Sequence, residues 1–152
     1  MSESIRIWLA VSYAEPFRTG GWAHVRSAGG AVTGQAAGDR RITRQRLTLM
    51  ALLAALKDAP PPVTLATADP LLAAVPDQLA ATGDAPPTED LDLWAQVTTA
   101  FKAGQIRIVR QAAAPGGPLA FTAAWAEQAR DRAKNGPFAF PIPKPNLAKA
   151  GV

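Results

Sequence analysis

The side chains in this sequence that are able to do chemistry are few, and their types restrict what that chemistry can be. The chain of 152 residues contains no cysteine and a single histidine, His24. Thiol catalysis, disulfide scaffolds and zinc ribbons are therefore excluded, and one histidine cannot form a cluster that holds a transition metal. Any metal or nucleophilic chemistry would have to come from the 12 carboxylates.

Six polar residues gather where a helix is expected to begin, and four of them are arginines. They are Arg40, Arg41, Thr43, Arg44, Gln45 and Arg46. Arginine binds phosphate bidentately, and the free N–H groups and dipole of a helix N-terminus add to anion binding. Arginines in a first helical turn are unfavourable unless a negative charge compensates them. The segment therefore predicts either a phosphate-binding surface or pairing with acidic residues of this chain or of a partner.

Charge is distributed along the chain in three blocks. Residues 1–57 carry eight basic and three acidic side chains, residues 58–101 carry seven acidic residues and no Lys or Arg, and residues 102–152 carry eight basic and two acidic side chains. The net charge of +4 favours an anionic partner, but blocks of opposite sign can also meet within one fold. With no apolar run near 18 residues, we expect a soluble, cytoplasmic protein with no membrane partner.

The expected elements alternate as in an α/β protein. Short runs rich in β-branched and aromatic residues predict strands at residues 5–12, 21–26, 31–37, 63–67 and 105–110. Amphipathic spacing predicts helices at residues 44–57, 70–79, 91–101 and 119–134, the second of them interrupted by Pro76. The fold class is therefore α/β, with a mixed five-stranded sheet flanked by helices.

We divide the chain into one domain at residues 1–135 and a proline-rich tail at residues 136–152. Four prolines between Pro137 and Pro145 prevent a continuing helix. The tail is expected to be extended, either as a strap or disordered end or as a docking strand for a partner.

Several short motifs carry a resemblance to a known family. They are Gly20-Gly21-Trp22-Ala23-His24-Val25; Gly38, Arg41, Thr43, Arg46, Leu49, Met50, Ala51 and Ala54-Ala55-Leu56; Leu65-Ala66-Thr67; Asp92-Leu93-Trp94; Gln105-Ile106-Arg107; and Glu127-Gln128-Ala129-Arg130. Their order and spacing resemble the ribonuclease H type I family over residues 5–135. The resemblance implies the ribonuclease H-like fold, and enzymes of that family cleave the RNA strand of an RNA–DNA hybrid with two Mg²⁺ ions.

The sequence departs from the family at the four carboxylates that hold these ions. The corresponding positions are Ala10, Thr48, Ala68 and Ala126. Mg²⁺ prefers hard, negatively charged oxygen ligands, which these side chains do not supply. We therefore expect no metal, no cofactor, no catalytic residue and no enzymatic activity.

Neighbouring acids offer a poor rescue of the lost carboxylates. Asp69 follows Ala68 and Glu127 follows Ala126, but one position along a strand reverses the face, and one along a helix rotates the side chain by about 100°. We interpret Asp69 as a helix cap before Pro70. A residual nuclease acting through Asp69 or Glu127 is the third alternative.

For binding, the resemblance has two opposite implications. Arg41 and Thr43 match positions of the family's DNA phosphate pocket, and Arg44 and Gln45 stand where the family has amides that contact the minor groove. In contrast, residues 77–90 are acidic where basic members of the family grip DNA, and they would repel phosphate.

The remaining large or unusual side chains are expected to be structural. Trp8, Trp22, Trp94 and Trp125 are expected in the core. His24 is expected at the surface or in strand pairing. The small residues 123–126 of the last helix present a face suited to close packing against another chain.

Two functions follow as hypotheses. The first is a non-catalytic nucleic-acid-binding or regulatory protein that contacts phosphates of DNA or an RNA–DNA hybrid through residues 40–46. The alternative is a protein–protein interaction module, a homodimer or heterodimer with no nucleic-acid binding.

Overall fold

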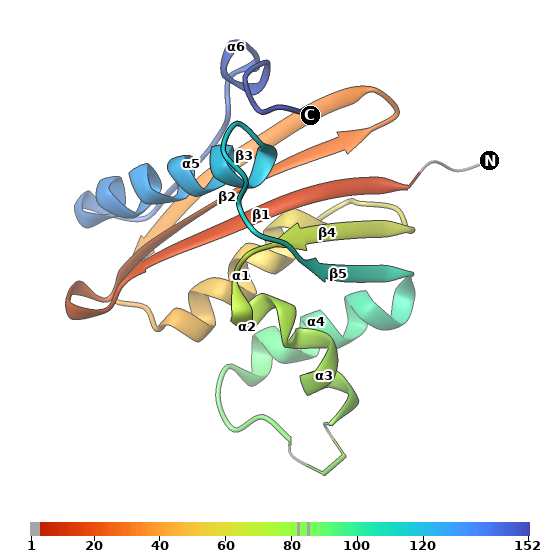
Figure 1. Cartoon of the computed structure of the whole chain (residues 1–152). Helices are drawn as coiled ribbons and strands as arrows, with labels where there is room; N and C mark the ends of the chain where they lie inside the picture. Colours follow the sequence, from red (N-terminus) through yellow and green to blue (C-terminus); the bar gives the residue numbers. More distant parts are fainter. Residues whose placement is uncertain (1–3, 82, 85) are drawn as a thin grey trace.

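Six strands of this chain form one mixed sheet in the computed structural model, which describes residues 4–81, 83–84 and 86–152 (Figure 1). The strands are β1 (Ile5–Ala14), β2 (Thr19–Ala28), β3 (Ala31–Arg40), β4 (Val63–Thr67), β5 (Ile106–Arg110) and β6 (Phe138–Pro141). The helices are α1 (Arg44–Leu56), α2 (Pro70–Ala73), α3 (Val75–Ala80), α4 (Leu91–Ala103), α5 (Pro118–Arg132) and α6 (Lys144–Leu147). Two short 3₁₀ turns, η1 (Glu15–Phe17) and η2 (Ala133–Asn135), complete the order.

The sheet has the strand order β5-β4-β1-β2-β3-β6. Strands β1, β2 and β3 form an antiparallel meander, whereas β4 and β5 run parallel to β1. The predicted α/β class and mixed sheet flanked by helices are confirmed.

The sheet has one strand more than the five predicted. Residues 138–141 of the proline-rich segment pair antiparallel with β3, from Gly38 opposite Phe138 to Gln35 opposite Pro141. Proline is excluded from central strands but tolerated at an edge, where its missing N–H faces outward. The prolines of residues 137–145 exclude a continuing helix, but they do not exclude an edge strand. The boundary drawn at residue 135 therefore lies within the part of the chain that builds the sheet.

The segment after β6 is also ordered against the sheet. Ile142, Leu147 and Ala150 are buried in the cluster that includes Trp8 and Val25. The end of the chain thus acts as a strap across β2 and β3, with the short helix α6 within it.

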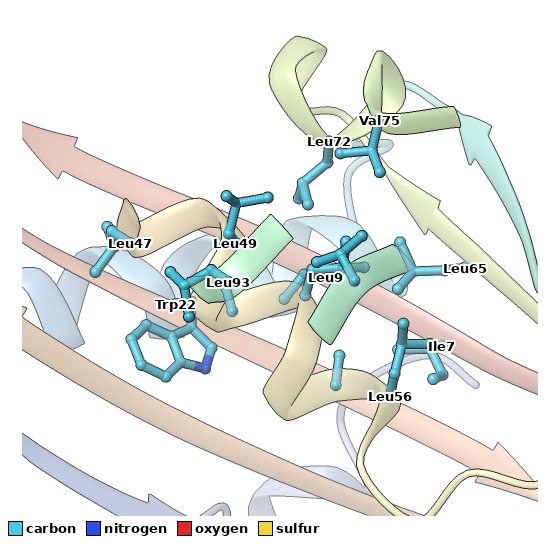
Figure 2. Close-up of a cluster of buried hydrophobic side chains, with 14 of the residues drawn as sticks. Ile7, Leu9, Trp22, Leu47, Leu49, Leu56, Leu65, Leu72, Val75 and Leu93 are labelled. Carbon is cyan, nitrogen blue, oxygen red and sulfur yellow. The ribbon is translucent and has the colours of Figure 1, made fainter. Parts of the chain in front are cut away.

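The sheet separates two hydrophobic clusters, because β1 alternates between its two faces. Ile7 and Leu9 belong to the cluster covered by α1 and α4, and Trp8 belongs to the cluster on the α5 side. Figure 2 shows the larger cluster, in which Leu9 lies among side chains from α1, α4 and the α2–α3 region. A strand buried on both faces has a nearly continuous apolar sequence, as residues 7–11 do.

Local signals set the ends of the helices. The Thr43 side chain accepts a hydrogen bond from the Arg46 N–H, and this caps α1. Asp69 caps α2 in the same way, as predicted. The expected break in residues 70–79 is confirmed as two short helices, α2 and α3, with Ala74 between them.

The tryptophans divide into two groups. Trp8, Trp22 and Trp94 are buried, as predicted, whereas Trp125 is only partly buried and packs at the border of the α5-side cluster. In the described part of the chain, none of the helices has the length and apolar character needed to cross a bilayer.

Helix α5 lies directly on two glycines of the sheet. A Cβ added at Gly21 would overlap the backbone N of Arg130 and lie 2.7 Å from the Ala126 carbonyl oxygen, and one added at Gly38 would lie 2.8 Å from the Ala129 carbonyl oxygen. Two of the helix positions involved, Ala126 and Ala129, are alanines with almost no exposed surface. The small-residue face expected to pack against another chain therefore packs, at Ala126, against this chain's own sheet.

Substitution Gly21→Ala is expected to destabilise the protein by about 3 kcal/mol, because the added methyl group meets helix backbone that cannot rotate away. The measurement is the free energy of unfolding in urea. Gly83→Ala is the matched control, since nothing lies within 4 Å of a Cβ at Gly83. Equal stability of the two variants would contradict the close contact.

His24 is buried, so the expectation of a surface position was wrong, although it does pair across strands with Leu9 and Gln35. Residues opposite each other in a sheet share a face, so His24 lies on the α1 side with Leu9. Its Nδ1 has no hydrogen-bond partner within the described chain. Burial, and secondarily the Arg26 charge, lowers the pKa of His24 to about 4.

This pKa predicts that stability falls as the pH is lowered from about 6.5 towards 4. The unfolded chain binds a proton near pH 6.5 and the folded chain only near 4, so acid favours unfolding. Between pH 7.5 and pH 4.5 the free energy of unfolding should drop by about 2 kcal/mol more in the wild type than in His24→Leu. If the free energy of unfolding changed with pH by the same amount in the wild type and in His24→Leu, the result would contradict a buried, neutral imidazole at His24.

Candidate nucleic-acid interface

A small pocket lies between the middle of β1, the end of β4, helix α1 and the start of α5. Its volume is about 240 Å³, and its lining includes Ala10, Ala68 and Ala123. Two of the four positions matched to metal-binding carboxylates, Ala10 and Ala68, are thus brought together.

The other two positions lie elsewhere. Ala126 is fully buried against the sheet, and the residues of α5 that line the pocket are Leu119 and Ala123. The loop before α5 has no motif that fixes its alignment, so the match of Ala126 to the fourth carboxylate stays a prediction. Thr48 is buried in α1, where its Oγ1 donates a hydrogen bond to the Arg44 carbonyl oxygen.

The charged side chains that line the pocket, among the described residues, are Arg44 and Asp69. Asp69 Oδ1 accepts hydrogen bonds from the N–H groups of Leu71 (2.9 Å) and Leu72 (3.1 Å). Asp69 Oδ2 lies 3.4 Å from Arg44 Nη2, and the carboxylate is only 6% exposed. Its oxygens are therefore committed to a helix cap and an ion pair.

This pocket does not fit the pair of Mg²⁺ ions that the fold family implies. Two divalent ions about 4 Å apart require several carboxylate oxygens. No group of three or more His, Asp or Glu side chains with a metal-binding arrangement occurs in residues 4–81, 83–84 and 86–152. Glu127 is exposed on α5 and is not among the residues that line the pocket.

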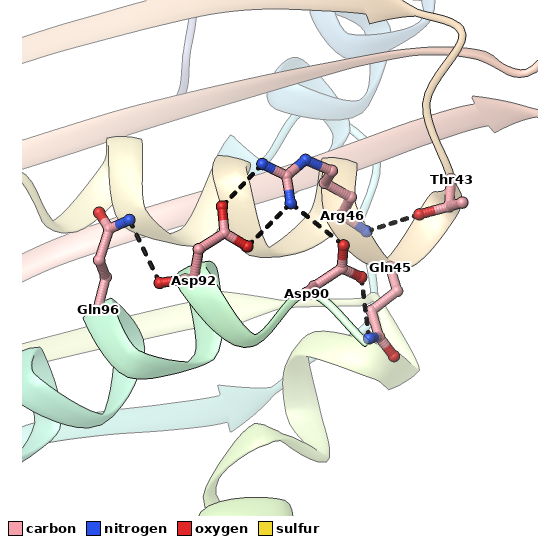
Figure 3. Close-up of polar contacts among 6 residues, drawn as sticks. All are labelled: Thr43, Gln45, Arg46, Asp90, Asp92 and Gln96. Atoms are coloured by element: carbon pink, nitrogen blue, oxygen red, sulfur yellow. Dashed lines mark hydrogen bonds and ion pairs between the residues drawn. The ribbon is translucent and has the colours of Figure 1, made fainter. Parts of the chain in front are cut away.

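Next to the pocket, two of the predicted phosphate-binding side chains bind carboxylates of the same chain (Figure 3). Arg46 forms a bidentate pair with Asp92, with Nη1–Oδ1 and Nη2–Oδ2 distances of 3.1 and 2.9 Å. Its Nη1 also lies 3.3 Å from Asp90 Oδ1, and Gln45 Nε2 donates to Asp90 Oδ2 at 3.1 Å. The hydrogen bonds with Asp92, and then those with Asp90, raise the pKa of Arg46, and Arg46 in turn lowers the pKa of Asp92.

These contacts explain how arginines are tolerated in the first turn of α1. The acidic start of α4 supplies the compensating negative charge, and it ties the two helices together at their N-termini. Pairing within the chain, one of the two outcomes that the sequence left open, therefore applies to Gln45 and Arg46.

The other four predicted residues are more accessible. Thr43 is used as the α1 cap, Arg40 Nη1 donates to the Lys134 carbonyl oxygen at 3.3 Å, and the Arg44 side chain is 53% exposed. Arg41 is exposed and makes no hydrogen bond or ion pair with any described residue. Its φ of 54° places a non-glycine residue in the left-handed region, which is uncommon and concentrates at functional sites.

Two further residues with cationic side chains contact the 40–42 segment and were not predicted from the sequence. The Arg18 carbonyl oxygen accepts a hydrogen bond from the Ile42 N–H (3.2 Å), and the Lys134 carbonyl oxygen accepts one from Arg40 Nη1 (3.3 Å). They come from the β1–β2 turn and from η2, far from residue 41 in the sequence. The pairing of Thr19 with Arg40 brings Arg18 to this segment, and the packing of η2 against β3 brings Lys134.

Comparison with known proteins defines the fold. No protein-family model matches the chain, and no curated protein sequence matches it. Among solved structures, the N-terminal RNase H domain of Rv2228c from Mycobacterium tuberculosis, solved as a fusion with maltose-binding protein, is similar with a TM-score of 0.66 and 15% identity. The similarity covers 88% of this chain and 98% of that one.

Two further RNase H1 structures show the same likeness. LC11-RNase H1 in complex with an RNA/DNA hybrid has a TM-score of 0.64 and 15% identity, over 86% of this chain and 99% of that one. LC9-RNase H1, described as a type 1 RNase H with the type 2 active-site motif, has a TM-score of 0.61 and 14% identity, over 100% and 87%. The chain therefore has the ribonuclease H fold.

The pocket predicts that Mg²⁺ does not stabilise the wild-type protein. Its melting temperature should be the same in 5 mM MgCl₂ as in NaCl of matched ionic strength, within about 1 °C, because no carboxylate set is available. The double variant Ala10→Asp/Ala68→Asp places two carboxylates at the pocket and should gain a Mg²⁺-dependent rise. A rise specific to Mg²⁺ in the wild type would contradict this account of the pocket.

Proposed function

We propose that this chain is a non-catalytic, regulatory nucleic-acid-binding protein that holds phosphates at the start of α1. The observation that carries the proposal is Arg41, an exposed guanidinium free of partners in the described structure, next to Arg40 in a segment whose backbone and side-chain contacts also bring in Arg18 and Lys134. Arginine binds phosphate through paired N–H groups, and a cluster of cations attracts a polyanion. The pocket lined by Ala10, Ala68 and Ala123 supports binding without cleavage.

The six residues predicted to bind phosphate have different roles in this proposal. Arg40, Arg41 and the exposed portion of Arg44 contact phosphate directly, while Thr43 caps the helix that presents them. Gln45 and Arg46 act through α4, because their polar groups are bound to Asp90 and Asp92. The ligand class is DNA or an RNA–DNA hybrid. A hybrid was bound in the LC11-RNase H1 complex, and the shared fold makes the same class of ligand the first to test here.

Substitution Arg41→Ala should weaken binding to a duplex or hybrid by about tenfold, which equals about 1.4 kcal/mol. It should also reduce the magnitude of the slope of log affinity against log salt by about 1, because one phosphate contact is lost. The measurement is fluorescence anisotropy of a labelled oligonucleotide between 50 and 200 mM salt.

Lys102→Ala is the matched control for this substitution. It removes the same unit of charge from an exposed position in the last turn of α4, away from α1's N-terminus. Equal losses of affinity in both variants would show attraction by net charge alone and would contradict a phosphate site at Arg41.

A protein–protein interaction module is the second candidate, and one observation favours it. Phe121, Trp125, Phe138 and Phe140 are partly exposed along α5 and β6, with neighbouring ring centroids 5.7 to 6.1 Å apart. Aromatic side chains are enriched at interfaces between proteins. A molecular mass that rises with concentration in light scattering, in a protein that does not bind nucleic acid at 50 mM salt, would select this function over the first.

A further inference from the structure

The β1–β2 connection presents an aromatic side chain to solvent. Phe17, at the end of η1, is 68% exposed, more than any other large apolar residue in the described chain. It belongs to neither hydrophobic cluster. An exposed phenyl group forgoes the free energy that burial of its apolar surface would contribute.

The backbone under Phe17 is held by several hydrogen bonds. The Phe17 carbonyl oxygen accepts from Thr19 Oγ1 at 3.1 Å, and the Arg18 N–H donates to the Glu15 carbonyl oxygen at 3.1 Å. Arg18 has a left-handed φ of 50°, and its carbonyl oxygen is bound by the Ile42 N–H. These hydrogen bonds hold the backbone that carries Phe17 beside the residues that lead into α1.

One cation lies over this ring, since Lys134 Nζ is 5.7 Å from its centroid. Arg40 Nη1 donates to the Lys134 carbonyl oxygen, and a backbone hydrogen bond joins Arg18 to Ile42, the residue after Arg41. The acids of these segments are Glu15 in the same turn and Asp39, whose Oδ1 accepts from the Arg40 N–H. The segments that meet at this turn therefore carry four cationic side chains against two carboxylates, and their net charge is positive.

We propose that Phe17 is a stacking platform for an unpaired nucleobase, next to the phosphate site at Arg41. This inference rests on the proposed function and narrows its ligand to nucleic acid that carries a single-stranded segment. Aromatic side chains that stack bases, set among cations that contact the backbone, are the common design of single-strand binding surfaces. In a duplex both faces of every internal base are covered by neighbours, and only the two terminal base pairs have one open face each. A phenyl ring therefore stacks mainly on unpaired bases, and a long blunt duplex presents almost no such surface.

The test compares three labelled probes of equal length, a blunt duplex, a duplex with a single-stranded overhang and a single strand, by fluorescence anisotropy at 100 mM salt. Phe17→Ala should weaken binding of the overhang and the single strand by about tenfold and leave the blunt duplex within about twofold. Phe17→Trp should restore the wild-type affinity. Leu91→Ala is the matched control, because Leu91 is also exposed (58%) and lies at the start of α4.

Each outcome separates this inference from the proposed function. If the wild type binds all three probes and Phe17→Ala changes none of them, or weakens the blunt duplex equally, the stacking platform is overturned and phosphate binding stands. If the wild type binds no probe even at 50 mM salt, the proposed function fails and the platform fails with it. Since Phe17 lies outside both hydrophobic clusters, an unchanged melting temperature is expected for Phe17→Ala.

Discussion

The close contact of helix α5 with the glycines of the sheet is the constraint on which the rest of the structure depends. Gly21 and Gly38 leave room for helix backbone where any side chain would collide, so α5 lies directly over β2 and β3. This places Ala126 out of reach of solvent and turns the first part of α5, at Ala123, towards Ala10 and Ala68. The pocket between the middle of β1 and the end of β4 therefore has a wall of methyl groups, which cannot replace the water around a divalent ion.

Electrostatic pairing then determines which arginines are available. The acidic start of α4 neutralises Arg46, and Asp69 partly neutralises Arg44 while it caps α2. Arg40 and Arg41 lie just before the helix and form no ion pair with these carboxylates. The β1–β2 turn brings Arg18 to the same segment, and η2 brings Lys134. The basic and acidic blocks of the sequence thus meet in the fold, and a positive surface remains at one end of the sheet.

Much of the fold could be predicted from sequence, because the signals involved are local. Thr43 and Asp69 have the side chains that cap helices, and the apolar run at residues 7–11 indicates a strand buried on both faces. The errors involved contacts distant in sequence, because β6 needed the exposed edge of β3 and the burial of His24 needed α1 packed on β2. The basic residues near Arg41 were predictable only in part for the same reason. Arg18 comes to this segment through strand pairing, and Lys134 through the packing of η2 on β3.

We propose that this chain uses the ribonuclease H fold to bind phosphates and does not cleave nucleic acid with Mg²⁺. The most direct measurement incubates the wild-type protein with an RNA–DNA hybrid in 5 mM Mg²⁺, and follows both bound fraction and strand length as salt is raised. We expect the strands to stay intact at every salt concentration. The affinity should fall with salt, with a slope of log affinity against log salt of about −3 or steeper. Shortened RNA strands that require Mg²⁺, or binding that is indifferent to salt, would contradict the proposal.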